Sequence, residues 1–372
     1  MAIRVRDIVE AMEQWADPSR AESWDNVGLL CGNKNNEVTG VVTALDVTEE
    51  TLDLAVEVEA QMIVAHHPLV FRPISSLAEG TRVTDTLALA QRHGIAVFAA
   101  HTNLDIAPGG VNDMLAERLR LIRLRGLHAT KSEPLYKLVV YVPLTHADMI
   151  RHVLGEAGAG HIGKYSHCSF STVGEGRFMP EEQATPYIGV SGKWETVEEQ
   201  RIETIVSRTH LCGVLEKMIA AHPYEEVAYD VYPLAGPGSE ITLGKVGEWE
   251  QAYSAKEALR FIKERLGIPA LRYAGSLERQ VRTVALCSGS GMEFYRDALR
   301  AGADLYVTGD VRYHEAQDAA AEGLLVADGH HFYTEQFVAE GIARYLSKYA
   351  LDQGWLLQVI EDNTRTDIFS FL

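Results

Sequence analysis

The feature that most constrains this fold is a set of short apolar segments, each of which ends abruptly at polar residues. Residues 38–46 (VTGVVTALD), 61–65 (QMIVA) and 95–100 (IAVFAA) are three such segments. Their length and hydrophobicity are typical of buried strands, and residues 51–59 and 84–93 between them carry helical periodicity. Strands that are buried on both faces and separated by helices predict a mostly parallel sheet in an α/β domain.

The last third of the chain repeats this alternation. The apolar segments 283–287, 304–308 and 324–327 each precede a turn and a helical pattern, the last of which extends through Tyr345. Residues 356–359 could add an edge strand. These patterns predict a second α/β lobe.

The middle of the chain has a different pattern. Residues 135–142 and 227–232 alternate apolar and polar side chains, as half-buried strands do, and 146–155 and 202–221 are predicted to be helical. The glycine-rich stretch 158–178 suits a long hairpin or a mobile loop. The order strand, helix, strands, helix, strand predicts a ferredoxin-like α+β unit.

We therefore predict a two-lobed α/β domain that is interrupted by a ferredoxin-like insert. Pro134 and the turn Gly236-Pro237-Gly238 are the predicted boundaries, which give lobe one residues 1–133, the insert 134–238 and lobe two 239–372. A chain of 372 residues is long enough for two or three domains at about 150 residues each.

The composition argues against nucleic-acid and membrane partners. The chain has 34 Lys and Arg against 52 Asp and Glu, and a net charge of −18 repels a phosphate backbone. No uncharged apolar run reaches the roughly 18 residues of a membrane span, and no apolar stretch of a signal peptide follows Met1. The four scattered cysteines form no Cys-x-x-Cys motif, so we expect a cytoplasmic protein with reduced thiols.

Histidine and carboxylate side chains follow the predicted strands. His66 and His67 end the strand at 61–65, and Asp105 lies in the loop after 95–100. Each has a simpler alternative, a strand-end histidine pair or a turn-forming Asp. Because the carboxyl ends of parallel strands meet at one edge of a sheet, we expect these side chains to share a crevice.

His331 and Glu335 form a second pair of candidate ligands. Residues four apart on a helix lie on one face, so both side chains can reach the same ion. A surface helix pair, or a helix cap around Asp328, is the alternative interpretation. The neighbouring His330 is an alternative ligand that spacing does not exclude.

Together these residues supply three imidazoles and two carboxylates. A bridging carboxylate and terminal histidines suit two divalent ions about 3.5–4 Å apart, with open positions for water or substrate. Mixed His and carboxylate ligation admits zinc, iron, manganese, nickel or cobalt. His101 and His314 also follow predicted strands and are candidate acid–base catalysts, and the turn Ser288-Gly-Ser-Gly291 is either a tight turn or a phosphate cradle.

Several motifs in the chain resemble a known family. They are 23–29 (SWDNVGL), 65–71 (AHHPLVF), 101–105 (HTNLD), 109–113 (GGVND) and 308–314 (TGDVRYH). The chain resembles the NGG-one-interacting-factor-three-like proteins, whose bacterial YqfO/YbgI-type members are often described as GTP cyclohydrolase 1 type 2 homologues. The middle segment 221–229 (AHPYEEVAY) is similar to the PII/CutA-like domain of longer members.

The resemblance implies a dinuclear metal centre, with ligands His66, His67, Asp105, His331 and Glu335, in a toroidal homohexamer. It favours a metal-dependent hydrolase acting on a small molecule, either a GTP cyclohydrolase or a phosphoesterase. The alternative is a non-enzymatic hexamer that stores or delivers metal or has a regulatory role, with the insert sensing a ligand.

Overall fold

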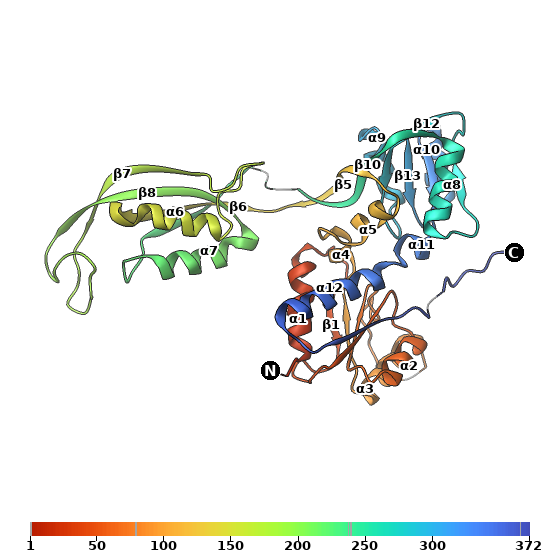
Figure 1. Cartoon of the computed structure of the whole chain (residues 1–372), viewed down its shortest axis with the longest axis horizontal. Helices are drawn as coiled ribbons and strands as arrows, with labels where there is room; N and C mark the ends of the chain where they lie inside the picture. Colours follow the sequence, from red (N-terminus) through yellow and green to blue (C-terminus); the bar gives the residue numbers. More distant parts are fainter. Residues whose placement is uncertain (1, 79, 237, 239, 365) are drawn as a thin grey trace. The chain divides into compact units, whose positions relative to one another are not determined.

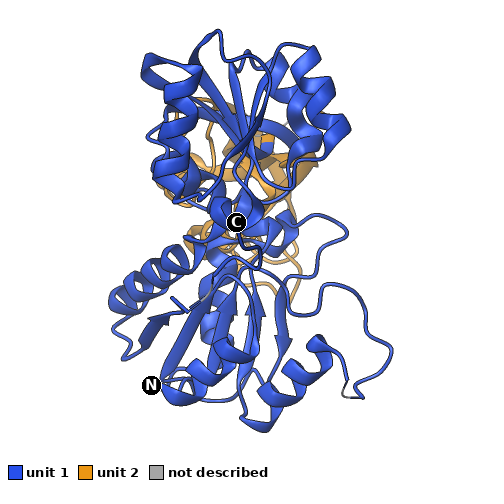
Figure 2. Cartoon of the chain, turned by 90° about the vertical axis from the view of Figure 1, so that its right-hand side faces the viewer, with its two compact units in different colours: residues 1–130, 241–372 blue, residues 131–240 orange. Residues whose placement is uncertain are grey.

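The apolar segments predicted to be strands are strands in the computed structural model, which describes residues 2–78, 80–236, 238, 240–364 and 366–372. The described residues divide into two compact units (Figure 2). Unit 1 comprises Met1–Thr130 and Ile241–Leu372, and unit 2 comprises Lys131–Glu240. Pro237 of the predicted second boundary lies outside the described residues.

Lobe one of unit 1 is a five-stranded sheet of order β1-β4-β3-β2-β15, in which only β1 is antiparallel to its neighbour. Its strands are β1 (Gly28–Cys31), β2 (Gly40–Ala44), β3 (Met62–Ala65), β4 (Ala96–Ala99) and β15 (Gln358–Glu361). Its helices are α1 (Val5–Trp15), α2 (Glu49–Glu57), α3 (Arg82–Arg92), α4 (Thr102–Ile106), α5 (Val111–Arg118) and α12 (Val338–Gln353).

Lobe two is a six-stranded sheet of order β11-β14-β13-β12-β10-β5 with parallel central strands. Its strands are β5 (Ile122–Ser132), β10 (Glu240–Ser254), β11 (Arg272–Ala274), β12 (Gln280–Leu286), β13 (Leu305–Thr308) and β14 (Leu325–Asp328). Its helices are α8 (Ala255–Leu266), α9 (Tyr295–Arg300), α10 (Tyr313–Ala321) and α11 (His331–Glu335).

One apolar layer joins the two lobes. Successive strand residues point to opposite faces of a sheet, so Val64 and Phe98 face one side while Ile63 and Val97 face the other. The first pair belongs to a core cluster that also contains side chains from lobe two and from α1, α5, α8 and α12. The second pair packs with α2 and α3. The shared layer makes the two lobes a single unit.

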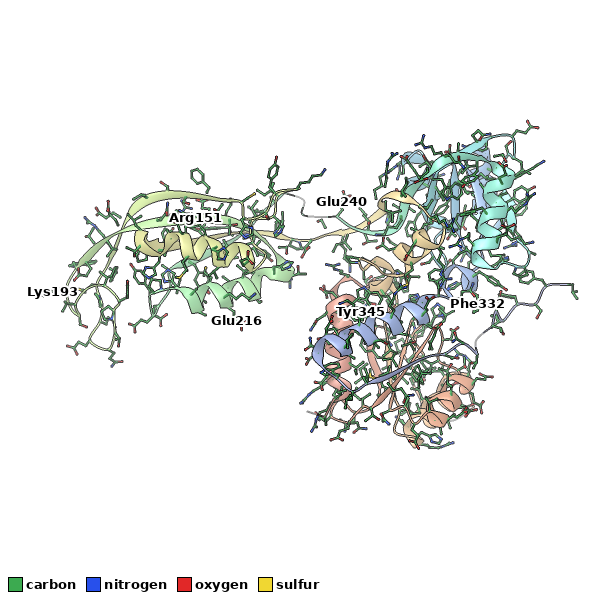
Figure 3. All side chains as sticks on the ribbon, viewed as in Figure 1. Arg151, Lys193, Glu216, Glu240, Phe332 and Tyr345 are labelled. Atoms are coloured by element: carbon green, nitrogen blue, oxygen red, sulfur yellow. The ribbon has the colours of Figure 1, made fainter. Side chains whose placement is uncertain are left out.

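The lobes exchange segments of chain. Helix α12 packs against β2, and β15 extends the sheet of lobe one, although both follow lobe two in sequence. Conversely, β5 follows lobe one in sequence and forms an edge of the sheet of lobe two. The helix predicted after His331 is two helices, α11 with Phe332 and α12 with Tyr345 (Figure 3).

Unit 2 is a four-stranded antiparallel sheet of order β7-β8-β6-β9 with two helices. Its elements are β6 (Leu135–Pro143), α6 (Ala147–Glu156), β7 (Ser169–Phe178), β8 (Glu195–Ser207), α7 (Arg208–Ala221) and β9 (Tyr229–Pro233) (Figure 1). The prediction of helix over 202–221 is wrong for its first six residues, which belong to β8. Ile202, Thr204 and Val206 are buried at period two against β6, and this local alternation outweighs helical periodicity.

The prediction of an α/β protein is confirmed by these sheets and helices. The described helices include none with both the length and the apolarity that a membrane crossing requires.

We expect Ile342→Ala on α12 to lower the free energy of unfolding by about 2–5 kcal/mol, because this fully buried side chain belongs to the layer that joins the lobes. Leu351→Ala on the same helix is the matched control, because Leu351 is 79% exposed and should change stability by less than about 0.5 kcal/mol. Urea unfolding of both variants measures the difference, and equal losses would contradict the shared core.

Candidate metal centre

Polar side chains from the two lobes converge where the parallel strands of both sheets end. In lobe one, β2, β3 and β4 are followed by Asp46, by His66 and His67, and by His101. In lobe two, β12, β13 and β14 are followed by Ser288, Asp310 and His331. Contacts between His67 and both His331 and Glu335 join the two edges.

Glu335 lies at the middle of this cluster and is buried. Its Oε2 is 3.0 Å from His67 Nε2 and 3.1 Å from His331 Nε2, while its Oε1 is 3.9 Å from His66 Nε2. Two groups therefore share this carboxylate: His67 and His331 on one side, and His66 and Asp105 on the other. Within each group the possible ligand atoms lie within 4.8 Å of one another.

Each histidine ring of the cluster is held through its Nδ1 atom. Such hydrogen bonds fix ring orientation and leave Nε2 as the ligand atom, a common arrangement around bound metals. The acceptors are Ala100 O for His66, Asp46 for His67, Asp310 for His331 and Asp25 for His101, all at 2.8–2.9 Å.

The surroundings of His66 fit a bound cation. Its Nδ1 must donate to the carbonyl of Ala100, because a carbonyl oxygen only accepts, so the neutral ring carries a lone pair on Nε2. That atom is buried, has no hydrogen-bond partner in the part of the chain that the structure describes, and lies 3.6 Å from Asp105 Oδ1. A buried lone pair facing carboxylates is unfavourable unless a proton or a metal ion lies between them. Histidine and carboxylate groups are thus positioned to bind metal.

In the absence of metal, protonated histidines pair with the carboxylates of the cluster. The charge of Glu335 raises the pKa of His331 to about 11. Burial opposes protonation of His67, but its hydrogen bonds to Asp46 and Glu335 outweigh burial and raise its pKa to about 9. Burial likewise disfavours ionisation of Glu335, yet the facing histidines hold the pKa of Glu335 well below its usual range.

The turn Ser288-Gly-Ser-Gly291 packs against the cluster. The hydroxyl of Ser288 donates to Asp105 Oδ1 at 3.3 Å, and a Cβ at Gly289 would collide with Glu335 Oε1. The backbone N–H groups of Ser288, Gly289 and Gly291 donate to side chains of Asn112, Thr334 and Thr308. Since these groups are already satisfied, the segment is a tight turn that encloses Glu335 rather than an open phosphate cradle.

The structure separates the alternatives that spacing left open. His331 lies in the cluster, whereas the ring of His330 points its Nε2 at Ala270 O, 2.9 Å away. His101 also joins the cluster, in a group with His66 and His67. His314 is exposed on α10 against Tyr313 and belongs to none of the histidine and carboxylate groups among the described residues.

Three carboxylates that orient the rings were not singled out from the sequence. Asp46 and Asp310 lie one residue beyond the first residue after β2 and β13, so the strand-end position that identified His66 would have found them. Asp25 gives no such signal, because it precedes β1 and meets His101 only through the fold. Burial opposes its ionisation, but its hydrogen bonds with His101 and Thr102 lower the pKa of Asp25 to about 2.

A cavity of about 310 Å³ opens beside His67 and His331. Arg272, Phe332 and the C-terminal residues 366–369 form other parts of its wall. Cavities of this size hold small molecules, so a ligand here would lie against the imidazole cluster.

The fold and the cluster together define an α/β protein with a partly buried histidine and carboxylate centre suited to metal. Residues 3–367 match the model of the Duf34/NIF3 (NGG1p interacting factor 3) family. The chain belongs to this family, as the motifs in its sequence had indicated.

Relatives and solved structures agree with this assignment. The chain is 44% identical over 366 residues to a Halalkalibacterium halodurans protein and 40% identical over 371 residues to a Bacillus subtilis protein, both named GTP cyclohydrolase 1 type 2 homolog. These matches cover 98% of both chains in the first case, and 100% of this chain and 99% of the relative in the second. A Bacillus cereus protein related to NIF3 has a structure that matches all of both chains, at a TM-score of 0.93 and 39% identity.

We expect His331→Ala to weaken metal binding by at least about 100-fold, since loss of even an outer partner of a ligand costs 10- to 100-fold. His330→Ala is the matched control, because the Nε2–H of His330 donates to the carbonyl of Ala270 and not into the cluster. Elemental analysis and metal titration of both variants measure the effect. Equal metal loss in both would exclude His331 as a specific ligand.

Metal binding at neutral pH should release protons from His67 and His331, whose pKa values are raised to about 9 and about 11. In the metal-free protein these protonated rings stabilise the fold. Their contribution is complete below about pH 6.5, the ordinary histidine value, and is lost as pH rises through about 9 and then about 11. Calorimetric titration in buffers of different ionisation enthalpy measures the protons, and binding without proton release would contradict the assignment.

Proposed function

We propose that this protein is a hydrolase that uses two divalent metal ions, related in activity to the GTP cyclohydrolase 1 type 2 homologues. One observation carries the proposal: the two oxygens of Glu335 face different ligand groups, as expected of a carboxylate that bridges two ions. His66 and Asp105 would hold one ion, and His67 and His331 the other. Bound ions of this kind act as Lewis acids and lower the pKa of a coordinated water.

His101 is our candidate proton carrier. Its Nδ1 donates to Asp25, so its other ring nitrogen is available to accept a proton. The carboxylate of Asp25 is buried and ionised, and its hydrogen bond to Nδ1 keeps the ring in one tautomer. This pair supports a role in moving protons between substrate and solvent.

The substrate we propose is a nucleotide or another phosphoester that enters the cavity beside His67 and His331. Asp46, Asp310 and Asp328 line this cavity and would repel a phosphate. Arg272 is in the wall but already forms an ion pair with Asp328. Attraction of a phosphate therefore requires the metal ions, which makes metal loading a condition for substrate binding.

The test is hydrolysis of GTP and of a phosphoester panel by protein loaded with the metal found by elemental analysis. We expect turnover that is abolished in His67→Ala, and a kcat in His101→Ala reduced by about 10²- to 10⁴-fold through loss of proton transfer. His314→Ala should retain activity, because this exposed side chain lies outside the cluster.

Turnover that persists in His67→Ala, or no turnover of any substrate by the loaded wild type, would contradict the hydrolase. A larger effect of His314→Ala than of His101→Ala would reverse the assignment of the proton carrier.

A non-enzymatic metal-handling or regulatory protein is the second candidate, and unit 2 is the observation that favours it. The strand order of unit 2 supports a ferredoxin-like, PII/CutA-like module. The module has its own core and a cavity of about 440 Å³ lined by Tyr141, Phe178, Tyr187 and Tyr224 around the buried Glu199. Metal transfer to an apo-enzyme without hydrolysis would favour this function. We also propose that the protein is a homohexamer, which native mass spectrometry tests. A cytoplasmic location is a further proposal, which cell fractionation tests.

A further inference from the structure

We propose that unit 2 carries a separate metal site formed by His152, Glu156 and His167, which takes a divalent transition metal such as zinc. One possible ligand atom from each residue lies within 4.8 Å of the other two. Two imidazoles and one carboxylate are a recognised zinc ligand set, with a further position left for water or another ligand. The site lies entirely within unit 2, so it is independent of the centre proposed for hydrolysis.

Helix α6 supplies two of the ligands. His152 and Glu156 are four residues apart, so their side chains lie on the same face of the helix, one turn from each other. Both are exposed to solvent, which gives a metal ion direct access. Arg151, which precedes His152, marks this helix in Figure 3.

The third ligand is set against α6 by two unusual backbone features. Gly155 is a buried residue in the last turn of α6, and a Cβ there would collide with the ring atom Cδ2 of His167. His167 itself has a φ of 58°, in the left-handed region that residues with a Cβ rarely adopt. A left-handed histidine is strained, so the chain accepts an unfavourable backbone at His167, while the glycine at 155 leaves the space that the ring occupies on the helix.

The backbone beside His167 is fixed. The next residue, Cys168, donates its N–H to Gly160 O and accepts from the hydroxyl of Thr204 on β8. The ring of His167 therefore extends from a fixed backbone just before β7, and its Nε2 lies 3.2 Å from Glu156 Oε1. A simple ion pair of His167 with Glu156 explains that contact. It does not explain why His152, whose ring makes no hydrogen bond among the described residues, completes the group.

The test is zinc-dependent protection of histidines in the full chain. Zinc should protect His152 and His167 from carbethoxylation, measured by peptide mass spectrometry, and leave His161 reactive. His161 is the internal control, because it is exposed in the same segment and belongs to none of the groups. This readout reports on unit 2 whether or not the central cluster is loaded or active.

Variants separate a metal site from an ion pair. Glu156→Gln and His152→Ala should each remove the protection of His167 and weaken zinc binding in unit 2 by at least about 100-fold. Gly155→Ala keeps all three ligands and favours the helix, but it should displace the ring of His167 and weaken binding as well. His161→Ala should change nothing. Absence of zinc protection in the wild type, or protection of His167 that survives His152→Ala, would overturn the proposal.

Discussion

The architecture of this protein depends on one buried carboxylate, Glu335, which faces imidazoles from both lobes. A buried charge is stable only when it is paired, and here the pairing groups come from β3 in one sheet and from α11 after the other. The shared apolar layer brings the two sheet edges together, and the glycine turn after β12 leaves room for the carboxylate between them. The packing that joins the two lobes therefore also brings together the groups that pair the charge of Glu335.

The same constraint explains why the cluster contains more acidic groups than a metal needs. Asp25, Asp46 and Asp310 lie behind the rings and fix the direction of each Nε2 atom. Asp46 and Asp310 also help to raise the pKa of His67 and of His331, which strengthens these imidazoles as metal ligands. Some of the acidic surplus of the chain is thus used to orient histidines.

The sequence was sufficient to predict the parallel strands of unit 1 and the edge where they end, because a continuous apolar run is a local signal. It did not predict the antiparallel or edge strands β1, β5, β10 and β11. It could not distinguish His330 from His331, because the two residues are adjacent in sequence. Helix α11 begins at His331, and the ring of His330 just before it points to Ala270. It also could not show that Asp25 reaches His101, or that β15 pairs with β2, because these contacts join residues far apart in the chain. In unit 2 the β-branched residues Ile202 and Val206 fitted helix and strand alike until their pairing with β6 was known.

The exchange of segments between the lobes has a consequence for biosynthesis. In a chain made from its N-terminus, every strand of unit 2 is synthesised before lobe two is complete, whereas the sheet of lobe one is completed only when β15 has been made. Domains fold as their sequence emerges, so unit 2 can mature while lobe one still has an open strand edge. Glu335 leaves the ribosome after all the other residues of its cluster, so the centre can close only after synthesis has passed α11.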